Sequence, residues 1–201
     1  MSASRRPTVI KLGGSLAASR RLANILKIVG AARVSCVVVP GGGPFADAVR
    51  AAQAEQGFSD VVAHRMALLA MHQMGMMLAA LHARLVPAET LAQIRRALAE
   101  SRIPVWLPQK LAEADPTIAT DWSVTSDALA ARLAERLGRA PVVLVKSCRV
   151  RSASAADLAA EGVVDAVFPS IVARGKLPWH VLGKGGERKL AALLGSRHGA
   201  A

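Results

Sequence analysis

Short apolar runs alternate along this chain with longer segments of helical periodicity. The runs have the length of strands, and those at 34–39 and 142–145 are continuously apolar, as expected of strands buried on both faces. All such runs comprise residues 8–12, 34–39, 104–108, 142–145 and 180–182. Because strands alternate with helices, the sequence predicts a three-layer α/β/α sandwich around a mainly parallel central sheet.

Helical periodicity fills the segments between these runs. The longest such segment, 59–84, carries five of the six methionines. Pro87 is expected near the start of another helix, running to about Ser101, because proline is tolerated in a first helical turn. A further helix is expected over 125–137, with the hydroxyl of Ser123 or Thr125 as its N-cap. The stretch 114–123 has few periodic signals and is expected to be a loop.

The size and composition of the chain favour one folded domain. Of its 201 residues, 52% are hydrophobic and 20% are charged, which is typical of a globular protein with a full core. No internal repeat, low-complexity tract or linker divides the sequence. We therefore expect a single domain over residues 1–201.

The charge and the cysteines narrow the range of partners. The net charge of +12 leaves two interpretations open: arginines on solvated helix faces, or a basic cleft that attracts phosphorylated ligands. Nucleic acid is not expected, because the basic residues are scattered and no nucleic-acid motif is present. Cys36 and Cys148 lack the spacing of a metal site. No run reaches the ~18 apolar residues of a membrane span, so we expect a cytoplasmic protein without a membrane partner.

Two of the predicted strands end in glycine-rich loops directly before a helix. Gly13-Gly14-Ser15 follows the first strand, and Gly41-Gly42-Gly43 follows the second. A helix N-terminus offers backbone N–H groups and a partial positive charge, and glycine lets a phosphate approach the main chain. Glycines also serve tight strand-to-helix turns, so either loop alone is weak evidence for phosphate binding. Neither loop is a Walker A motif.

Lys11 strengthens the case for the first loop. It lies near the carboxyl end of an apolar strand, where open α/β sheets place their ligands. A lysine in such a strand is costly to bury without an anionic partner. The alternative is a lysine at the strand end that simply reaches solvent.

Three segments together resemble the amino acid kinase superfamily, which includes acetylglutamate, uridylate, isopentenyl phosphate and carbamate kinases. They are 9–15 (VIKLGGS), 39–43 (VPGGG) and 125–131 (TSDALAA), and their order and spacing fit over nearly the whole chain. The resemblance implies an ATP-dependent phosphotransferase that uses ATP with Mg²⁺ carried by the nucleotide. It also implies an acceptor-binding half over about 1–120 and an abbreviated nucleotide-binding half over about 121–201.

The resemblance implies roles for the residues that match its motifs. Lys11 matches the lysine that bridges the transferred phosphoryl group, Lys176 matches the second lysine, and Asp127 matches the aspartate that organises both. The ATP phosphates would meet Gly13, Gly14 and Ser15, and the acceptor would meet Gly41, Gly42, Gly43 and Thr125. Phosphoryl transfer depends on such positioning and on neutralised negative charge more than on covalent help.

A finer resemblance connects the chain with the compact kinases of methanofuran and methylofuran biosynthesis. It rests on segments 63–65, 107–110, 122–127 and 164–169. Those kinases convert an (aminomethyl)furanmethanol phosphate to its diphosphate, which implies a small phosphorylated acceptor. His64 and Arg65 could bind the acceptor phosphate, although a His–Arg pair is equally typical of a solvated helix end.

One segment departs from the superfamily pattern. Where relatives carry Asp-Val-Asp-Gly along the nucleotide, this chain has Lys146-Ser147-Cys148-Arg149. Lys146 or Arg149 could contact phosphate instead, but we expect both to be solvated loop charges. This departure favours one alternative, a non-catalytic ligand-binding or partner subunit. A second alternative is a kinase for another acceptor, such as a nucleoside monophosphate or an acyl-amino acid.

The methionine-rich segment also bears on assembly. Methionines at helical spacing are most often filler in a core or an interface. Relatives place this helix beside the acceptor and at a subunit contact, so the resemblance implies a homodimer or a higher homo-oligomer.

Overall fold

The computed structural model describes residues 6–196, and within that range six strands form one sheet. The strand order is β3-β4-β2-β1-β5-β6, and every neighbouring pair is parallel. The strands are β1 (Thr8–Leu12), β2 (Cys36–Pro40), β3 (Leu85–Ala88), β4 (Ile103–Trp106), β5 (Val142–Val145) and β6 (Trp179–Leu182). The predicted parallel sheet is confirmed, and all its strands end at the same edge.

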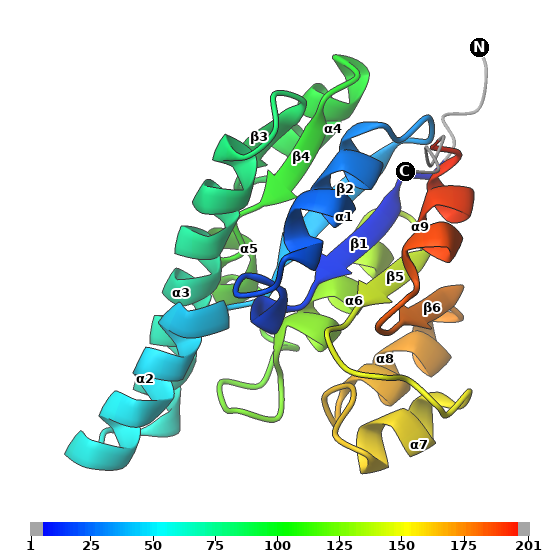
Figure 1. Cartoon of the computed structure of the whole chain (residues 1–201). Helices are drawn as coiled ribbons and strands as arrows, with labels where there is room; N and C mark the ends of the chain where they lie inside the picture. The colour runs from blue at the N-terminus through cyan, green and yellow to red at the C-terminus, as the bar shows by residue number, and fades with distance from the viewer. Residues whose placement is uncertain (1–5, 197–201) are drawn as a thin grey trace.

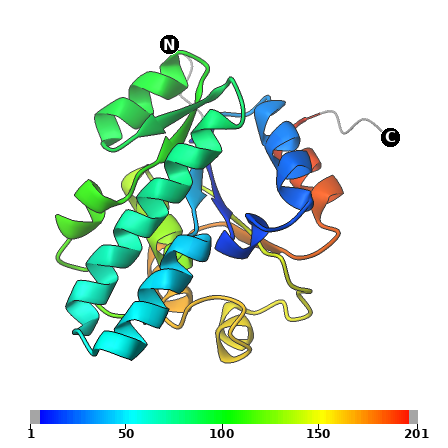
Figure 2. The same cartoon turned by 60° about the vertical axis from the view of Figure 1, so that its left-hand side comes forward.

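Helices cover both faces of this sheet (Figure 1), which confirms the predicted sandwich. One face carries α1 and α9, the other carries α4, α6 and α8, and α2 and α3 lie side by side (Figure 2). The helical elements are η1 (Gly14–Leu16), α1 (Arg21–Gly30), α2 (Gly43–Gln56), α3 (Asp60–Ala80), α4 (Leu91–Ala99), α5 (Gln109–Glu113), α6 (Ser126–Arg136), α7 (Ala155–Ala160), α8 (Phe168–Gly175) and α9 (Glu187–Leu194). None of these helices combines the length and the apolar character needed to cross a membrane.

Successive residues of the central strands face opposite helical layers. Val9 packs in the core cluster that contains α6 and α8, whereas Ile10 packs in the cluster that contains α1 and α9. Side chains two apart in a strand share a face, so Lys11 lies on the same side as Val9. The period of the strand therefore directs this charged side chain toward α6.

The segment around Pro87 differs from its prediction. Leu85–Ala88 is a strand, and α4 begins only after Thr90, whose hydroxyl accepts a hydrogen bond from the Gln93 N–H in a capping box. The prediction of a helix starting near Pro87 is wrong, because β3 is an edge strand, and an edge tolerates a residue without a backbone N–H.

Candidate active site

Two lysines meet one buried carboxylate at the carboxyl edge of the sheet. Lys11 Nζ lies 2.8 Å from Asp127 Oδ1, and Lys146 Nζ lies 2.5 Å from Asp127 Oδ2. The side chains of Lys11, Lys146 and Asp127 are only 6%, 12% and 4% exposed. We call these three residues the lysine–aspartate cluster.

The fold brings the cluster together from three elements. β1 and β5 are adjacent and parallel with Leu12 opposite Val145, so Lys146 begins its loop directly beside the end of β1. Asp127 lies in the first turn of α6, where the helix dipole favours a carboxylate. The expectation that Lys146 is a solvated loop charge is therefore wrong.

The cluster shifts the ionisation of its members. Burial alone would raise the pKa of Asp127, but the ammonium groups of Lys11 and Lys146 outweigh it and hold this pKa below its ordinary value. Burial and the charge of Lys11 lower the pKa of Lys146 to about 8, against the opposing effect of Asp127. Since two ammonium groups face one carboxylate, the cluster suits an additional anion.

Lys176 does not join this cluster. It is the exposed C-cap residue of α8, in the left-handed conformation with φ 47°, and it precedes β6. Within the parallel sheet, Lys11 is in register with Leu144 and thereby with Val181, so Lys176 lies toward the opposite, amino edge. The prediction that Lys176 converges with Lys11 and Asp127 is wrong, and Lys146 is the second lysine that contacts Asp127.

Asp165 fixes the start of the helix that carries Asp127. Its Oδ2 accepts hydrogen bonds from the Thr125 N–H at 3.0 Å, the Thr125 hydroxyl at 2.9 Å and the Ala128 N–H at 2.8 Å. Its Oδ1 accepts one from the Phe168 N–H at 2.8 Å, so one carboxylate joins the first turns of α6 and α8. Burial and the nearby Asp127 raise the pKa of Asp165.

The two glycine loops lie against each other at the same edge, as predicted. A Cβ on Gly14 would lie 2.2 Å from the Gly43 nitrogen, and a Cβ on Gly41 would lie 2.4 Å from the Gly14 nitrogen. Side chains at these positions would thus force the loops apart. The Gly13 N–H donates to the Val145 carbonyl at 2.9 Å, so it continues the sheet instead of pointing at a ligand.

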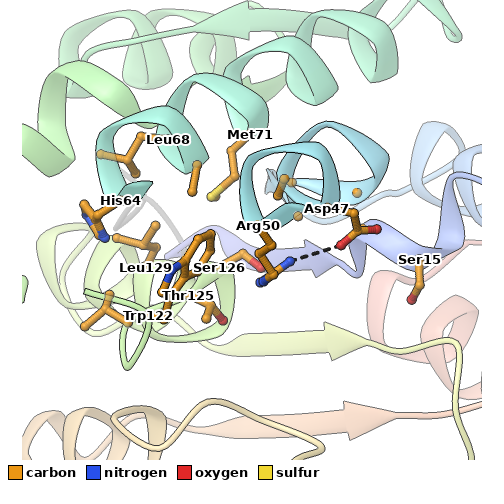
Figure 3. A pocket seen from close by; sticks show the side chains of 17 residues that line it. Ser15, Asp47, Arg50, His64, Leu68, Met71, Trp122, Thr125, Ser126 and Leu129 are labelled. Carbon is orange, nitrogen blue, oxygen red and sulfur yellow. Dashed lines mark hydrogen bonds and ion pairs between the residues drawn. The ribbon is translucent and has the colours of Figure 1, made fainter. Parts of the chain in front are cut away.

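A first cavity of about 210 Å³ opens beside these loops, between α2, α3 and the start of α6 (Figure 3). It is lined by Gly14, Ser15, Gly41, Gly42, Gly43, Ala46, Asp47, Arg50, His64, Ala67, Leu68, Met71, Trp122, Val124, Thr125, Ser126 and Leu129. The predicted acceptor residues Gly41 to Gly43, His64 and Thr125 are thus brought together. Arg65 is exposed and is not among the lining residues.

A second cavity of about 810 Å³ lies along β6 and the loops beside it. Four of its lining side chains are cationic: Arg149, Arg151, Lys184 and Lys189. The loop after Lys146 forms one wall, and the Lys184 N–H donates to the Cys148 carbonyl at 2.8 Å. Among residues 6–196, no group of three or more His, Cys, Asp or Glu side chains is arranged to hold a metal ion.

Arg21 links the loops that surround Lys146. Its Nη1 donates to the Lys146 carbonyl and its Nη2 to the Gly183 carbonyl, both at 3.1 Å, while Nε pairs with Glu187 at 2.6 Å. The planar guanidinium therefore holds the loop after β5, the loop after β6 and the start of α9 in one arrangement.

Sequence reasoning missed part of this site. A lysine at the end of a buried strand indicates a ligand site at Lys11, and Lys146 follows a buried strand in the same way. Arg21 and Arg50 carry no such signal, because their partners lie in distant segments of the chain. Trp122 belongs to a segment of the finer resemblance, but nothing in that segment indicates its contact with Arg50.

Known proteins resemble this chain in sequence and in fold. Residues 6–148 match the model of the Amino acid kinase family. The chain is 23% identical to the (5-(aminomethyl)furan-3-yl)methyl phosphate kinase of Methanocaldococcus jannaschii, over 94% of each protein.

Two solved structures share the fold. The uridylate kinase of Archaeoglobus fulgidus superposes with a TM-score of 0.70 at 18% identity, over 94% of this chain and 96% of that one. A carbamate kinase of Giardia lamblia bound to AMP-PNP has a TM-score of 0.59 at 12% identity, over 97% of both chains. At such identities the likeness concerns the fold.

The unusual ionisation of Lys146 gives a direct test of the cluster. We expect the ¹³Cε resonance of Lys146, assigned by its loss in Lys146→Arg, to titrate with a pKa near 8 instead of the ordinary 10.5. In Asp127→Asn this pKa should fall further, because the carboxylate stabilises the charged ammonium. A wild-type titration near the ordinary value would contradict the burial of Lys146 against Lys11 and Asp127.

Proposed function

This chain belongs to the amino acid kinase family and is a kinase, and we propose that its acceptor is a small molecule that already carries a phosphate group. The observation that supports this most is the lysine–aspartate cluster, with one cavity at the glycine loops and another along the loop that follows Lys146. The similarity to the aminomethylfuran phosphate kinase over 94% of both proteins supports an acceptor of that class. The reaction would then belong to the synthesis of a methanofuran-type or methylofuran-type coenzyme in the cytoplasm.

In the proposed arrangement the acceptor occupies the first cavity. The phosphates of ATP contact Gly14, Ser15 and the cluster, and its nucleoside occupies the second cavity. The first half of the chain would thus hold the acceptor, and the second half the nucleotide. The basic lining of the second cavity and its position beside Lys146 support this assignment. Mg²⁺ accompanying the nucleotide would supply further charge neutralisation.

Lys11 and Lys146 would stabilise the charge that spreads over the transferred phosphoryl group. An oxygen of the acceptor phosphate forms a bond to the γ-phosphorus as the bond from that phosphorus to the bridging oxygen of ADP breaks. The products are a diphosphate and ADP. Asp127 holds both Nζ atoms in place beforehand, so the lysines need little rearrangement as the charge develops.

A non-catalytic partner subunit is the alternative that the Lys146–Arg149 segment favours, because it lacks the Asp-Val-Asp-Gly of relatives. The contact of Lys146 with Asp127 weighs against it, since the altered segment supplies a cation at the point of transfer. A nucleoside monophosphate acceptor is disfavoured by the small volume of the first cavity.

Substitutions in the cluster test the proposed mechanism. Lys11→Ala should lower kcat about 10²–10³-fold while weakening ATP binding much less, because the charge is needed most in the transition state. Asp127→Asn should also slow the reaction, since it releases both lysines. Steady-state kinetics with ATP and the aminomethylfuran phosphate would measure both effects.

Arg95→Ala is the control for these variants, because Arg95 is exposed on α4 and should leave the kinetics unchanged. Wild-type turnover by both Lys11→Ala and Asp127→Asn would refute the site. A wild-type chain that binds no nucleotide would favour the non-catalytic alternative.

We further propose a homodimer formed through α3. Val62, Leu69 and Met76 are spaced by seven residues, so they share one side of the helix, and they are 44%, 43% and 57% exposed. Such a stripe on a long helix favours a subunit contact. Light scattering at micromolar concentration should give twice the monomer mass, and Leu69→Glu should give the monomer. A monomeric wild type would contradict the dimer but not the fold.

A further inference from the structure

A guanidinium and an indole ring face each other at the first cavity. Arg50 Cζ lies 4.4 Å from the centroid of the Trp122 ring, and the Trp122 Nε1 donates to Gln53 Oε1 at 2.7 Å. Arg50 and Gln53 both belong to α2, whereas Trp122 belongs to the segment between α5 and α6. Two contacts thus fix the ring against α2, and Figure 3 shows Arg50 between Trp122 and Asp47.

Further contacts hold the same segment from α3. His64, which is 5% exposed, has its Nδ1 3.3 Å from the backbone oxygen of Asp121. Gln53 in turn donates through Nε2 to Asp60 Oδ1 at 2.7 Å, at the start of α3. Residues 121 and 122 are therefore anchored to both helices that flank the cavity.

The guanidinium has capacity for another partner. Arg50 Nη1 donates to Asp47 Oδ1 at 3.0 Å, but these side chains are 51% and 75% exposed, so the pair is a weak surface contact. A guanidinium stacked on an aromatic face keeps its five N–H donors in its own plane. Asp47 is the one carboxylate among the lining residues that the structure describes, so Arg50 has little competition for an anion in the cavity.

The rest of the cavity suits a small, partly apolar body. Leu68, Met71 and Leu129 supply apolar surface, and the glycine loops lie at the end nearest the cluster. The volume of about 210 Å³ is below the ~300–1,000 Å³ common for small-molecule sites. The first cavity therefore combines the anion-binding guanidinium of Arg50 with space for about one ring.

Building on the proposed function, we propose that Arg50 binds the phosphate that the acceptor brings with it, and that Trp122 positions Arg50 for this task. The planar fork of Arg50 presents paired donors to the phosphate oxygens, and stacking on Trp122 keeps the fork in one orientation. The kinase would thereby prefer a phosphorylated acceptor to the corresponding alcohol. Arg65 belongs to α3 and its side chain is exposed, so the proposal gives it no role in binding this phosphate.

Calorimetry without nucleotide tests this proposal independently of turnover. The probes are (5-(aminomethyl)furan-3-yl)methyl phosphate and the corresponding alcohol. Arg50→Met should weaken binding of the phosphate about 10–100-fold, the range for a lost charge-assisted hydrogen-bond pair, and leave binding of the alcohol unchanged. Arg50→Lys should recover only part of the loss, because it restores the charge without the fork.

The role of Trp122 is tested with matched variants. Trp122→Leu should reproduce most of the effect of Arg50→Met, whereas Trp122→Phe keeps an aromatic face and should retain the preference for the phosphate. In steady-state assays both Arg50→Met and Trp122→Leu should raise the KM for the acceptor and leave the KM for ATP unchanged. Arg65→Met removes the same charge from an exposed site and is the control.

Any of three results with the variants would overturn the proposal. The first is that Arg50→Met binds the phosphate with wild-type affinity. The second is that Arg50→Met loses as much affinity for the alcohol as for the phosphate. The third is that Arg65→Met loses as much affinity for the phosphate as Arg50→Met. A wild type that binds neither probe would also overturn it. Loss of phosphate selectivity in Arg50→Met, together with a wild type that transfers nothing from ATP, would refute the kinase mechanism and support the anion-binding role of Arg50.

Discussion

The carboxylate of Asp127, buried between two ammonium groups, is the interaction on which the rest of the site depends. Burial of a charge is costly unless partners compensate for it, and here the compensation comes from Lys11 and Lys146. These residues come from β1, the end of β5 and the start of α6, so they meet only when the sheet and its helix are correctly assembled. The cluster is therefore a product of the fold and, in the proposed mechanism, the centre of its chemistry.

Other parts of the structure keep that cluster in place. Asp165 holds the first turn of α6, which carries Asp127, and Arg21 holds the backbone of Lys146. The packed glycine loops bring the first cavity to the cluster, and the loop after Lys146 leads to the second cavity. In the proposed mechanism, two ligands bound in these cavities approach each other at the two lysines, which is the arrangement that phosphoryl transfer requires.

Local sequence signals predicted the features that depend on local order. The strand at Lys11, both glycine loops and the start of α6 were predictable, because each combines periodicity with turn or cap residues. The strand at Pro87 was missed, since proline suits a first helical turn as well as an edge strand. Features that join distant segments were harder to predict from the sequence. The motif match indicated Lys176 as the partner of Asp127, but the strand register places Lys146 there. The contact of Arg50 with Trp122 joins segments more than 70 residues apart, and no local pattern marks it.

The central claim is that Lys146, and not Lys176, is the second lysine of phosphoryl transfer. Single-turnover rates with saturating ATP and aminomethylfuran phosphate test it most directly, because saturation removes differences in binding. The account predicts that Lys146→Ala slows the chemical step about 10²–10³-fold, as loss of one preorganised charge partner would, whereas Lys176→Ala reacts like the wild type. A normal rate in Lys146→Ala together with a large loss in Lys176→Ala would contradict it.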